Sequence, residues 1–495
     1  MQPNRRKFCQ LALISSLSSI FFPNIVNKAV AKPFISPKQN ISFLPTAKRW
    51  LVHLNQDLLP FWTMESALGY PIGNFPSIRC NNGALLDRKN PCPEIKTFRN
   101  FNRLMLPRTY VVALSRQTYA YGVAFHLTGE PKYLEYAQAG VNYLRAQAFD
   151  RKNGGVYSYR DDEKNTWEPA VEYRNPQEQA YCLLGLSFYY YLTRDPEVLS
   201  DILAVKNYIF SNYNNSQLGT FQWVLKNGNN STVTDKHLLA VLDQLNTYMV
   251  LLTPLLPEPE QSQWKQDMVM LSQMMLSHFY SAKDNLFFLR AENKSLETTD
   301  CDFGHTIKSM WMLQMIGLIV GDSQLEKFAE ENGLLVLERA YLQQSGSWAS
   351  QINKGGEINH DKQWWIYAEL DQFAASLAVK KPAVTTYISQ TYNYWFKYFV
   401  DSKYAEVWKG IDATTNQPKP DDLPKMRPWK NAYHSFEHAL VGYITTQQIH
   451  HHPIVLYYQF NQLPQPQNIR PYFYTSTIKK LESLPNQIYK VTFTN

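Results

Sequence analysis

The chain has few cysteines, little excess charge and no long uninterrupted apolar segment. Only five of its 495 residues are cysteine, and no two of them form a Cys-x-x-Cys pair, which argues against a thiolate zinc or redox site. Lys and Arg outnumber Asp and Glu by only 49 to 42. Because no basic patch is interleaved with aromatic residues, the sequence does not indicate a nucleic-acid-binding protein.

Residues 1–31 have the pattern of an export signal. Arg5 and Arg6 precede an apolar stretch from Leu11 to Phe22, and Ala29–Ala31 forms an A-x-A cleavage site. The stretch is too short to span a membrane comfortably. The paired arginines resemble a twin-arginine signal, with an ordinary secretory signal or an uncleaved anchor as alternatives. We therefore expect an exported, periplasmic protein without a membrane anchor after cleavage, and a net charge of +3 once four basic residues are removed.

Four cysteines remain after that segment. Cys80 and Cys92 bracket the loop-like stretch CNNGALLDRKNPC, and export makes a disulfide between them permissible. The sequence leaves open whether they pair or stay free. Cys182 lies within an apolar helical run and is predicted to be a small core residue, and Cys301 stands alone.

Six helical hairpins are predicted between residues 45 and 450. Second helices begin near residues 106, 173, 234, 303, 361 and 432, so a new unit starts about every 60 to 70 residues. The expected first helices cover 46–60, 132–148, 195–213, 260–281, 324–342 and 381–400; the second cover 106–128, 173–194, 234–254, 303–320, 361–378 and 432–450. The second helices are apolar on more than one face, which is typical of an inner, buried ring.

This repeat predicts an all-α protein, an (α/α)6 barrel with short β-hairpins on one rim. After each first helix comes an aromatic stretch with turn residues, namely GNFPS, GGVYSY, GTFQWV, NLFFLRA, GSWASQ and AEVWKG. An open solenoid is the alternative, but it needs polar terminal caps that the sequence does not contain. Residues 451–495 leave the pattern and are predicted to form a C-terminal extension packed on the barrel.

Polar motifs recur near the starts of the second helices, so their side chains are expected to point into one funnel. They are ALSRQTYAYG with Arg116, DKHLLAVLDQL with His237, CDFGHTIKSMWML with His305, KQWWIYAELDQF with Trp365 and Glu369, and RPWKNAYHSFEHAL with Trp429, Lys430, Tyr433 and His434.

Histidine near a helix N-terminus has a defined chemistry. The positive end of the helix dipole disfavours imidazolium, so the ring stays neutral and can accept a proton. Two such rings on opposite walls can remove a proton from one face of a carbon and return it to the other. Trp365 and Trp429 would stack on a sugar ring while Arg116, Lys430 and Glu369 bind hydroxyls.

In order and spacing these motifs resemble the N-acylglucosamine 2-epimerase family, which includes cellobiose 2-epimerases and aldose–ketose isomerases. DFGH at 302–305 resembles its D-x-G-H, WWIYAE at 364–369 its W-W-x-x-A-E, and PWKNAYH at 428–434 its W-K-x-x-Y-H, while Arg116 falls where the family places a substrate-facing arginine.

The resemblance implies cofactor-free epimerisation or isomerisation next to a carbonyl of a mono- or oligosaccharide, by a monomer or homodimer. His305 and His434 would be the acid/base pair, assisted by His237 and Arg116.

Lys308 departs from the family pattern, which has Glu three residues after the D-x-G-H histidine. A cation one turn from His305 would lower the pKa of that ring, whereas Glu would raise it. Three interpretations of Lys308 stay open. Its side chain binds an anionic group of the substrate, its presence means that the family's proton-transfer chemistry is lost here, or it extends along the helix to reach solvent. Tyr367 stands where the family often has Gln.

Other interpretations stay open for several residues. Glu369 can be a buried structural residue, and Arg116 can pair with a carboxylate. HSFEH at 434–438 matches the H-x-x-E-H zinc motif, but Glu482 is the only acid after His438, so no metal is predicted.

Two further functions fit the same barrel. A glycan hydrolase or lyase would need paired carboxylates, for which Asp302, Glu369, Glu178 and Glu437 are candidates. A non-catalytic glycan-binding protein would keep the aromatic residues but lack turnover.

Overall fold

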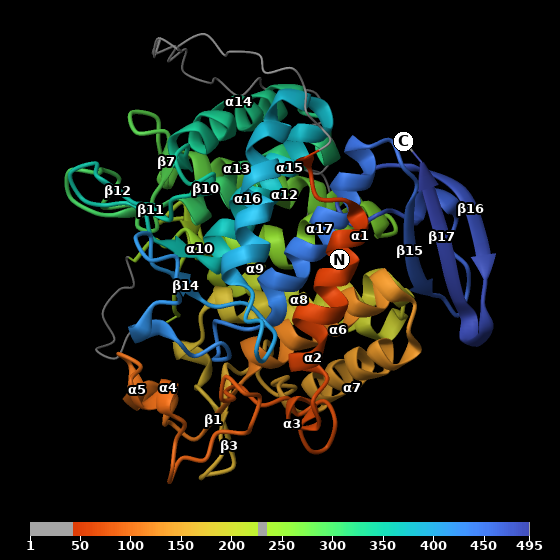
Figure 1. Ribbon diagram of the computed structural model, residues 1–495. Coiled ribbons are helices and arrows are strands. Elements are labelled where there is room, and N and C mark those ends of the chain that lie inside the picture. The colour runs from red at the N-terminus through yellow and green to blue at the C-terminus, as the bar shows by residue number, and fades with distance from the viewer. Residues whose placement is uncertain (1–42, 226–234, 495) are drawn as a thin grey trace, which may run out of the picture. The chain divides into compact units, whose positions relative to one another are not determined.

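The six predicted hairpins are present, and their second helices form a closed inner ring (Figure 1). The computed structural model describes residues 43–225 and 235–494, which lie in the compact unit Pro37–Asn495. The inner helices are α6 (Val111–Thr128), α8 (Pro176–Thr193), the continuous run α10 (Leu239–Gln244), η4 (Leu245–Met249) and α11 (Val250–Leu252), α13 (Phe303–Val320), α15 (Trp364–Lys380) and α17 (Ala432–Ile449). Because α17 packs against α6, the ring closes and the molecule is an (α/α)6 barrel rather than an open solenoid.

The outer helices alternate with the inner ones along the chain. They are the run α1 (Ala47–Val52), η2 (His53–Leu58) and α2 (Leu59–Trp62), then α7 (Pro131–Gln147), α9 (Pro196–Tyr213), α12 (Glu260–His278), α14 (Ser323–Ala340), and α16 (Thr385–Tyr394) continued by η7 (Trp395–Phe399). In α6 all residues from Val111 to Leu127 are buried, whereas α7 buries one face. This difference follows from the sequences, since a helix that is apolar all round must be covered on every side.

Short strands precede several inner helices, and two of these helices begin later than the sequence predicts. They form the sheet of β1 (Arg108–Tyr110), β2 (Tyr159–Asp161) and β3 (Thr166–Glu168), the sheet of β8 (Cys301–Asp302), β11 (Gln351–Ile352) and β12 (Ile358–Asn359), and the pair of β13 (Lys362–Gln363) and β14 (Gly410–Ile411). Two inner helices therefore begin at 111 and 364 rather than at 106 and 361, because the preceding residues pair as strands.

Hairpins follow the outer helices at three of the six predicted places. They are β4 (Asn214–Asn215) with β5 (Thr220–Phe221), β6 (Tyr280–Ser281) with β7 (Leu286–Phe287), and β9 (Tyr341–Leu342) with β10 (Ser347–Trp348). Single bridges, Phe149–Val156 and Val400–Val407, replace them after α7 and η7. The hairpin predicted at 73–77 is wrong. The chain turns there through Gly69 and Gly73, with φ of 70° and 106°, and buries Phe75 instead.

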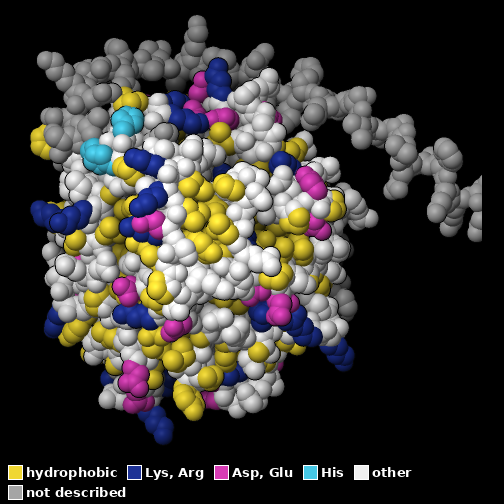
Figure 2. Space-filling view, turned by 90° about the vertical axis from the view of Figure 1, so that its right-hand side faces the viewer, with side chains coloured by type: hydrophobic (Ala, Val, Ile, Leu, Met, Phe, Trp, Pro, Cys, Tyr) yellow, Lys and Arg dark blue, Asp and Glu magenta, His cyan; other side chains and the backbone are white. Residues whose placement is uncertain are grey.

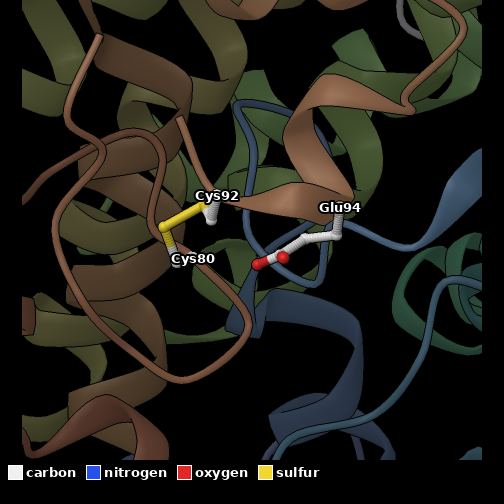
Figure 3. A group of neighbouring side chains, drawn as sticks. All are labelled: Cys80, Cys92 and Glu94. Carbon is white, nitrogen blue, oxygen red and sulfur yellow. A yellow bond between two sulfur atoms is a disulfide. The ribbon is translucent and has the colours of Figure 1, made fainter. Parts of the chain in front are cut away.

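The segment between α2 and α6 contains a disulfide loop that joins Cys80 to Cys92, with their Cα atoms 6.1 Å apart (Figure 3). Short helices α3 (Glu65–Leu68), α4 (Pro93–Lys96) and α5 (Phe101–Leu104) accompany it. Residues before and after the loop, Ile78, Ile95, Phe98 and Leu104, form a small buried apolar cluster. Cys80, Cys92 and Glu94 do not form a metal site. The two sulfurs are bonded to each other, and Glu94 Oε1 accepts a hydrogen bond from the backbone N–H of Asn81 at 2.6 Å. Cys182 and Cys301 are buried and free.

The C-terminal extension forms a three-stranded antiparallel sheet in the order β15 (Ile454–Gln459), β17 (Ile488–Thr494), β16 (Thr477–Ser483). Strand β15 packs against α6, α8 and α17 (Figure 1). Figure 2 looks at this side of the molecule and shows hydrophobic patches among interspersed charges of both signs. The remaining single turns are η3 (Val171–Tyr173), η5 (Thr253–Leu255), η6 (Pro382–Val384), η8 (Pro420–Asp422), η9 (Pro466–Asn468) and η10 (Pro485–Gln487).

The predicted export signal, residues 1–31, lies outside the described residues. Within 43–225 and 235–494, none of the helices combines the length and the hydrophobicity that crossing a bilayer requires.

Removing the disulfide is expected to destabilise the protein. The Cys80→Ser, Cys92→Ser double variant frees a loop whose ends are 12 residues apart, which should lower the free energy of unfolding by about 3 kcal/mol. Urea unfolding measures this change. Reduction should have the same effect on the unmodified protein and none on the double variant; equal stability of oxidised protein and double variant would contradict the prediction.

Candidate active site

The first turns of the inner helices surround a cavity of about 300 Å³. Its walls come from all six inner helices and the loop before α17. The lining residues are Arg116, Gln177, Tyr181, Leu239, Asp243, His305, Lys308, Trp364, Trp365, Trp429 and His434. Six residues that the sequence predicts for the site are therefore brought together here: Arg116, His305, Lys308, Trp365, Trp429 and His434.

His305 is oriented by the residue that caps its own helix. Asp302 accepts the backbone N–H of His305 through Oδ1 at 2.7 Å, which starts α13, and its Oδ2 lies 2.7 Å from His305 Nδ1. Burial would raise the pKa of Asp302, but His305 outweighs burial and holds the pKa below its ordinary value. A carboxylate at Nδ1 fixes the proton on that nitrogen and leaves Nε2 as the basic atom.

His434 is kept neutral by its surroundings. It is buried in the first turns of α17, and burial together with the charges of Arg116 and Lys308 lowers its pKa well below the ordinary value. Its Nδ1 lies 3.5 Å from Glu369 Oε1. The ring of Trp365 stands between the two histidines, with its centroid 4.6 Å from that of His305 and 6.0 Å from that of His434. The two imidazoles thus flank one indole and have different polar partners.

A layer of buried charge lies one helical turn below these rings. Lys308 follows His305 by one turn, Glu369 follows Trp365, and Glu437 follows His434. Lys308 Nζ is 3.4 Å from Glu369 Oε1 and 3.8 Å from Asp243 Oδ1. We call these four residues, Lys308, Asp243, Glu369 and Glu437, the floor.

Protonation in the floor is set by burial and by neighbouring charges. Burial would lower the pKa of Lys308, but Tyr181, Glu369 and Asp243 outweigh it and the pKa is raised. Burial raises the pKa of Glu369 to about 8, against the opposing effect of Lys308, and it also raises the pKa of Glu437. Lys308 does not snorkel to solvent, since it is only 3% exposed. Its charge is already compensated by protein carboxylates, which does not favour the binding of a substrate anion.

Arg116 lies against aromatic rings rather than a carboxylate. Its guanidinium is 4.3 Å from the Tyr181 ring and 4.8 Å from the Trp429 ring, and Nη1 donates to the Trp429 carbonyl at 2.8 Å. No carboxylate of the described residues pairs with it, and its Nε is buried without a hydrogen-bond partner. The cation is held in place but keeps donor capacity for a ligand.

Four predicted site residues are not part of the cavity wall. His237 stacks on Trp223 at 4.4 Å, and burial with the nearby charges of Arg290 and His305 lowers its pKa to about 4. Lys430 is fully buried and pairs with Glu406 at 2.9 Å. It therefore anchors the start of α17 instead of facing a sugar.

Tyr433 and Glu369 belong to the layer beneath the wall. The Tyr433 hydroxyl donates to Glu437 Oε1 at 3.3 Å, and Glu369 contacts Lys308 as described above.

Asp243 is the charged residue of the cavity wall that the sequence motifs did not single out; Gln177, Tyr181 and Leu239 also line the wall without having been predicted. Asp243 lines the cavity, pairs with Lys308, and accepts a hydrogen bond from Gln177 at 2.8 Å and a longer one from Tyr181 at 3.5 Å. Its signal was present, because an acid inside the otherwise apolar stretch LLAVLDQL of an inner helix must be buried with partners.

The H-x-x-E-H motif does not build one site. His438 lies in the core with Nε2 3.0 Å from Asp371 and packs against Trp50 and Trp395, whereas His434 faces the cavity. Ligand atoms of Glu369, His434 and Glu437 do lie within 4.8 Å of one another, but Lys308 supplies the positive charge at this place. The residues present therefore fit an ammonium rather than a metal ion.

The Glu369 carboxyl should make stability depend on pH. Its folded-state pKa of about 8 is above the ordinary 4.5, so the stability that its proton contributes is complete below about pH 4.5 and is lost as pH rises through about 8. We expect this loss to be on the order of a few kcal/mol. Glu369→Gln, which mimics the protonated form, should flatten the curve of unfolding free energy against pH, measured by denaturant titration.

Glu163→Gln, on an exposed loop, is the control and should leave that curve unchanged. If Glu369→Gln has the same pH dependence as the unmodified protein, Glu369 is not the proton acceptor.

The comparisons with known proteins identify the family and the fold. A model of the N-acylglucosamine 2-epimerase family matches residues 105–437. The cellobiose 2-epimerase of Dictyoglomus turgidum is 22% identical over 338 residues, which are 66% of this chain and 84% of that protein. The solved cellobiose 2-epimerase of Bacillus thermoamylovorans has a TM-score of 0.66 at 17% identity and covers 80% of this chain and 98% of its own. A D-mannose isomerase structure has a TM-score of 0.63 at 14% identity and covers 84% and 99%.

The solved structures show a shared fold, and the family model spans the segment that contains Arg116, His305 and His434. This chain therefore belongs to the N-acylglucosamine 2-epimerase family of carbohydrate epimerases.

Proposed function

We propose that the protein interconverts sugars by moving a proton at the carbon next to the carbonyl, through an enediolate. The observation that carries the proposal is the pair of imidazoles that flank Trp365 in one cavity, one with Asp302 at Nδ1 and the other with Glu369. Because their polar partners differ, the two rings are suited to opposite steps of one proton transfer. The substrate is an open-chain reducing sugar, as a mono- or oligosaccharide.

In the first step His305 acts as the base. With its Nδ1 proton directed to Asp302, Nε2 accepts the proton of C2, and the C–H electron pair forms the C1–C2 double bond while the carbonyl electrons move to oxygen. The Arg116 guanidinium, which is free of carboxylate partners among the described residues, stabilises the negative oxygen. Asp302 stabilises the imidazolium that His305 becomes.

In the second step His434 returns a proton. A neutral His434 whose Nδ1 faces a protonated Glu369 carries its own proton on Nε2. Delivery of that proton to C2 from the other face gives the epimer, and the Glu369 proton then passes to Nδ1, so His434 remains neutral. Delivery to C1, with transfer of the O2 hydroxyl proton to the C1 oxygen and formation of the carbonyl at C2, gives the ketose instead.

The hydrolase alternative is not favoured by the cavity. Glycoside hydrolysis requires two carboxylates that flank the scissile bond, and Asp243 is the sole carboxylate among the residues that line the cavity in the described chain. Asp302 is engaged by His305, and Glu369 and Glu437 lie one turn deeper, around Lys308.

Replacement of either histidine should slow proton transfer at C2. Proton NMR in deuterated water, with a panel of reducing sugars, follows the loss of the C2 hydrogen signal and the appearance of the epimer or ketose. We expect His305→Ala to slow the loss of the C2 signal, and His434→Ala to slow the appearance of product, each about 10²- to 10⁴-fold, the usual contribution of a general base or acid. His278→Asn is the control, because His278 lies on α12, does not line the cavity, and hydrogen-bonds the Gly219 carbonyl through Nε2.

Retention of exchange by the double variant His305→Ala, His434→Ala would contradict the mechanism. Sugar binding by the unmodified protein without any exchange would instead indicate a glycan-binding protein.

A further inference from the structure

A short piece of the C-terminal extension enters the barrel at the end opposite the cavity. This plug, Arg470–Tyr474, lies between β15 and β16 and contacts the later turns of the inner helices, whereas the cavity is lined by their first turns. Phe473 packs on Trp311 of α13 with ring centroids 5.5 Å apart, and the Tyr474 hydroxyl is 2.8 Å from Ser376 of α15.

Tyr472 is the residue of the plug that reaches deepest toward the floor. Its hydroxyl donates to Glu437 Oε1 at 2.7 Å and accepts from the Tyr119 hydroxyl at 3.1 Å. Its backbone N–H donates to the Tyr191 hydroxyl at 2.8 Å. The phenol is only 3% exposed. The backbone at Tyr472 has φ of 56°, a conformation that L-residues with bulky side chains adopt only when the surroundings impose it.

Glu437 is the point at which the plug meets the floor. Besides Tyr472 it accepts hydrogen bonds from Tyr433 and from Gln372, each at 3.3 Å. Among these three donors the Tyr472 hydroxyl is the nearest, and it comes from a segment outside residues 105–437, the part that the family model matches. Glu437 in turn is a charged neighbour of Lys308 and Glu369.

We propose that Tyr472 is a positioning residue for the proton transfer: its hydroxyl holds Glu437, and Glu437 keeps Lys308 and Glu369 in place beneath His434. This inference rests on the proposed function, and it assigns the C-terminal extension a part in the active site. The hydrogen-bond path runs from Tyr119 through Tyr472 to Glu437 and links the neighbouring inner helices α6 and α17.

The charge state of Glu437 depends on groups from several elements. Those that face it or its partners are Tyr119 of α6, Asp243 of α10, Lys308 of α13, Glu369 of α15, Tyr433 of α17, and Tyr472 and Tyr474 of the plug. A hydroxyl that donates to a carboxylate favours the ionised form, so its removal lets Glu437 take up a proton at higher pH.

The test compares Tyr472→Phe with Tyr474→Phe. Both variants delete one buried phenol oxygen from the same segment, but only the first loses a bond to Glu437. For Tyr472→Phe we expect kcat for C2 exchange to fall about 10-fold or more with KM little changed, and the acid limb of the pH–rate profile to move to higher pH. Tyr474→Phe should leave the profile in place, and thermal melts show how far each variant is destabilised.

A second measurement does not depend on turnover. The imidazole signals of His434 are followed by NMR in histidine-labelled protein and assigned with a His434→Gln variant. Tyr472→Phe should shift these signals and Tyr474→Phe should not. If the unmodified protein exchanges no sugar but this difference is seen, the proposed function fails while the link through Glu437 stands. If the two variants agree in both the pH–rate profile and the His434 signals, the proposal is overturned.

Discussion

The polar interior of this barrel depends on one buried ammonium group, that of Lys308. Lys308 lies among the carboxyl groups of Asp243, Glu369 and Glu437, deep inside a ring of helices whose other side chains are mostly apolar. An ion buried in this way is tolerated only with partners, because the loss of hydration costs far more than the hydrophobic surface around it returns. A single cation cannot neutralise three carboxylates, and burial raises the pKa of both glutamates, that of Glu369 to about 8. The floor is thus a group of coupled ionisable side chains that the inner helices enclose.

The charges of the floor explain why His305 and His434 are not equivalent. His434 lies over the positive side of the floor, near Lys308 and Arg116, and is held neutral. His305 stands beside Asp302, which caps the helix that begins at Phe303 and accepts a hydrogen bond from Nδ1–H of His305. A reaction that must take a proton from one face of a carbon and return it to the other needs this kind of asymmetry. The lysine one turn below His305 therefore does not by itself argue against the chemistry, because it acts on His434 and Glu369 as well as on its neighbour.

Local patterns predicted much of the fold and the upper layer of the site. The inner helices are apolar on all sides, so their burial and their order as a ring followed from the sequence, and the motif at 302–305 pointed to His305, although the role of Asp302 as the cap of that helix is known only from the structure. Contacts between distant segments could not be read in this way. Lys430 looked like a ligand residue, but its partner Glu406 comes from the loop after η7 and the pair is fully buried. Asp243 was passed over because its partner Lys308 lies on another helix.

The start of α6 shows a second reason why local sequence patterns do not predict every element. Apolar periodicity extends back to residue 106, yet 108–110 pair with β2, because strand pairing with a segment some fifty residues away outweighs local propensity. The same reasoning applies to the C-terminal extension. Its prolines and lack of helical periodicity indicated a separate segment, but nothing in the local pattern indicated that Tyr472 would reach Glu437.

The extension also has a structural consequence for the barrel. A closed ring of six hairpins leaves an open end on the side of the helix C-termini, where buried polar groups such as Glu437 would otherwise meet water. The plug fills this end with Tyr472 and Phe473, while β15 covers α6, α8 and α17 from outside. Excluding water there strengthens every charge interaction in the floor, since the same ion pair is several times stronger at low dielectric than in solvent. The same inner helices must therefore keep water away from the floor at the plug end of the barrel and admit the substrate at the cavity end. The extension meets the first of these requirements without occupying the cavity that serves the second.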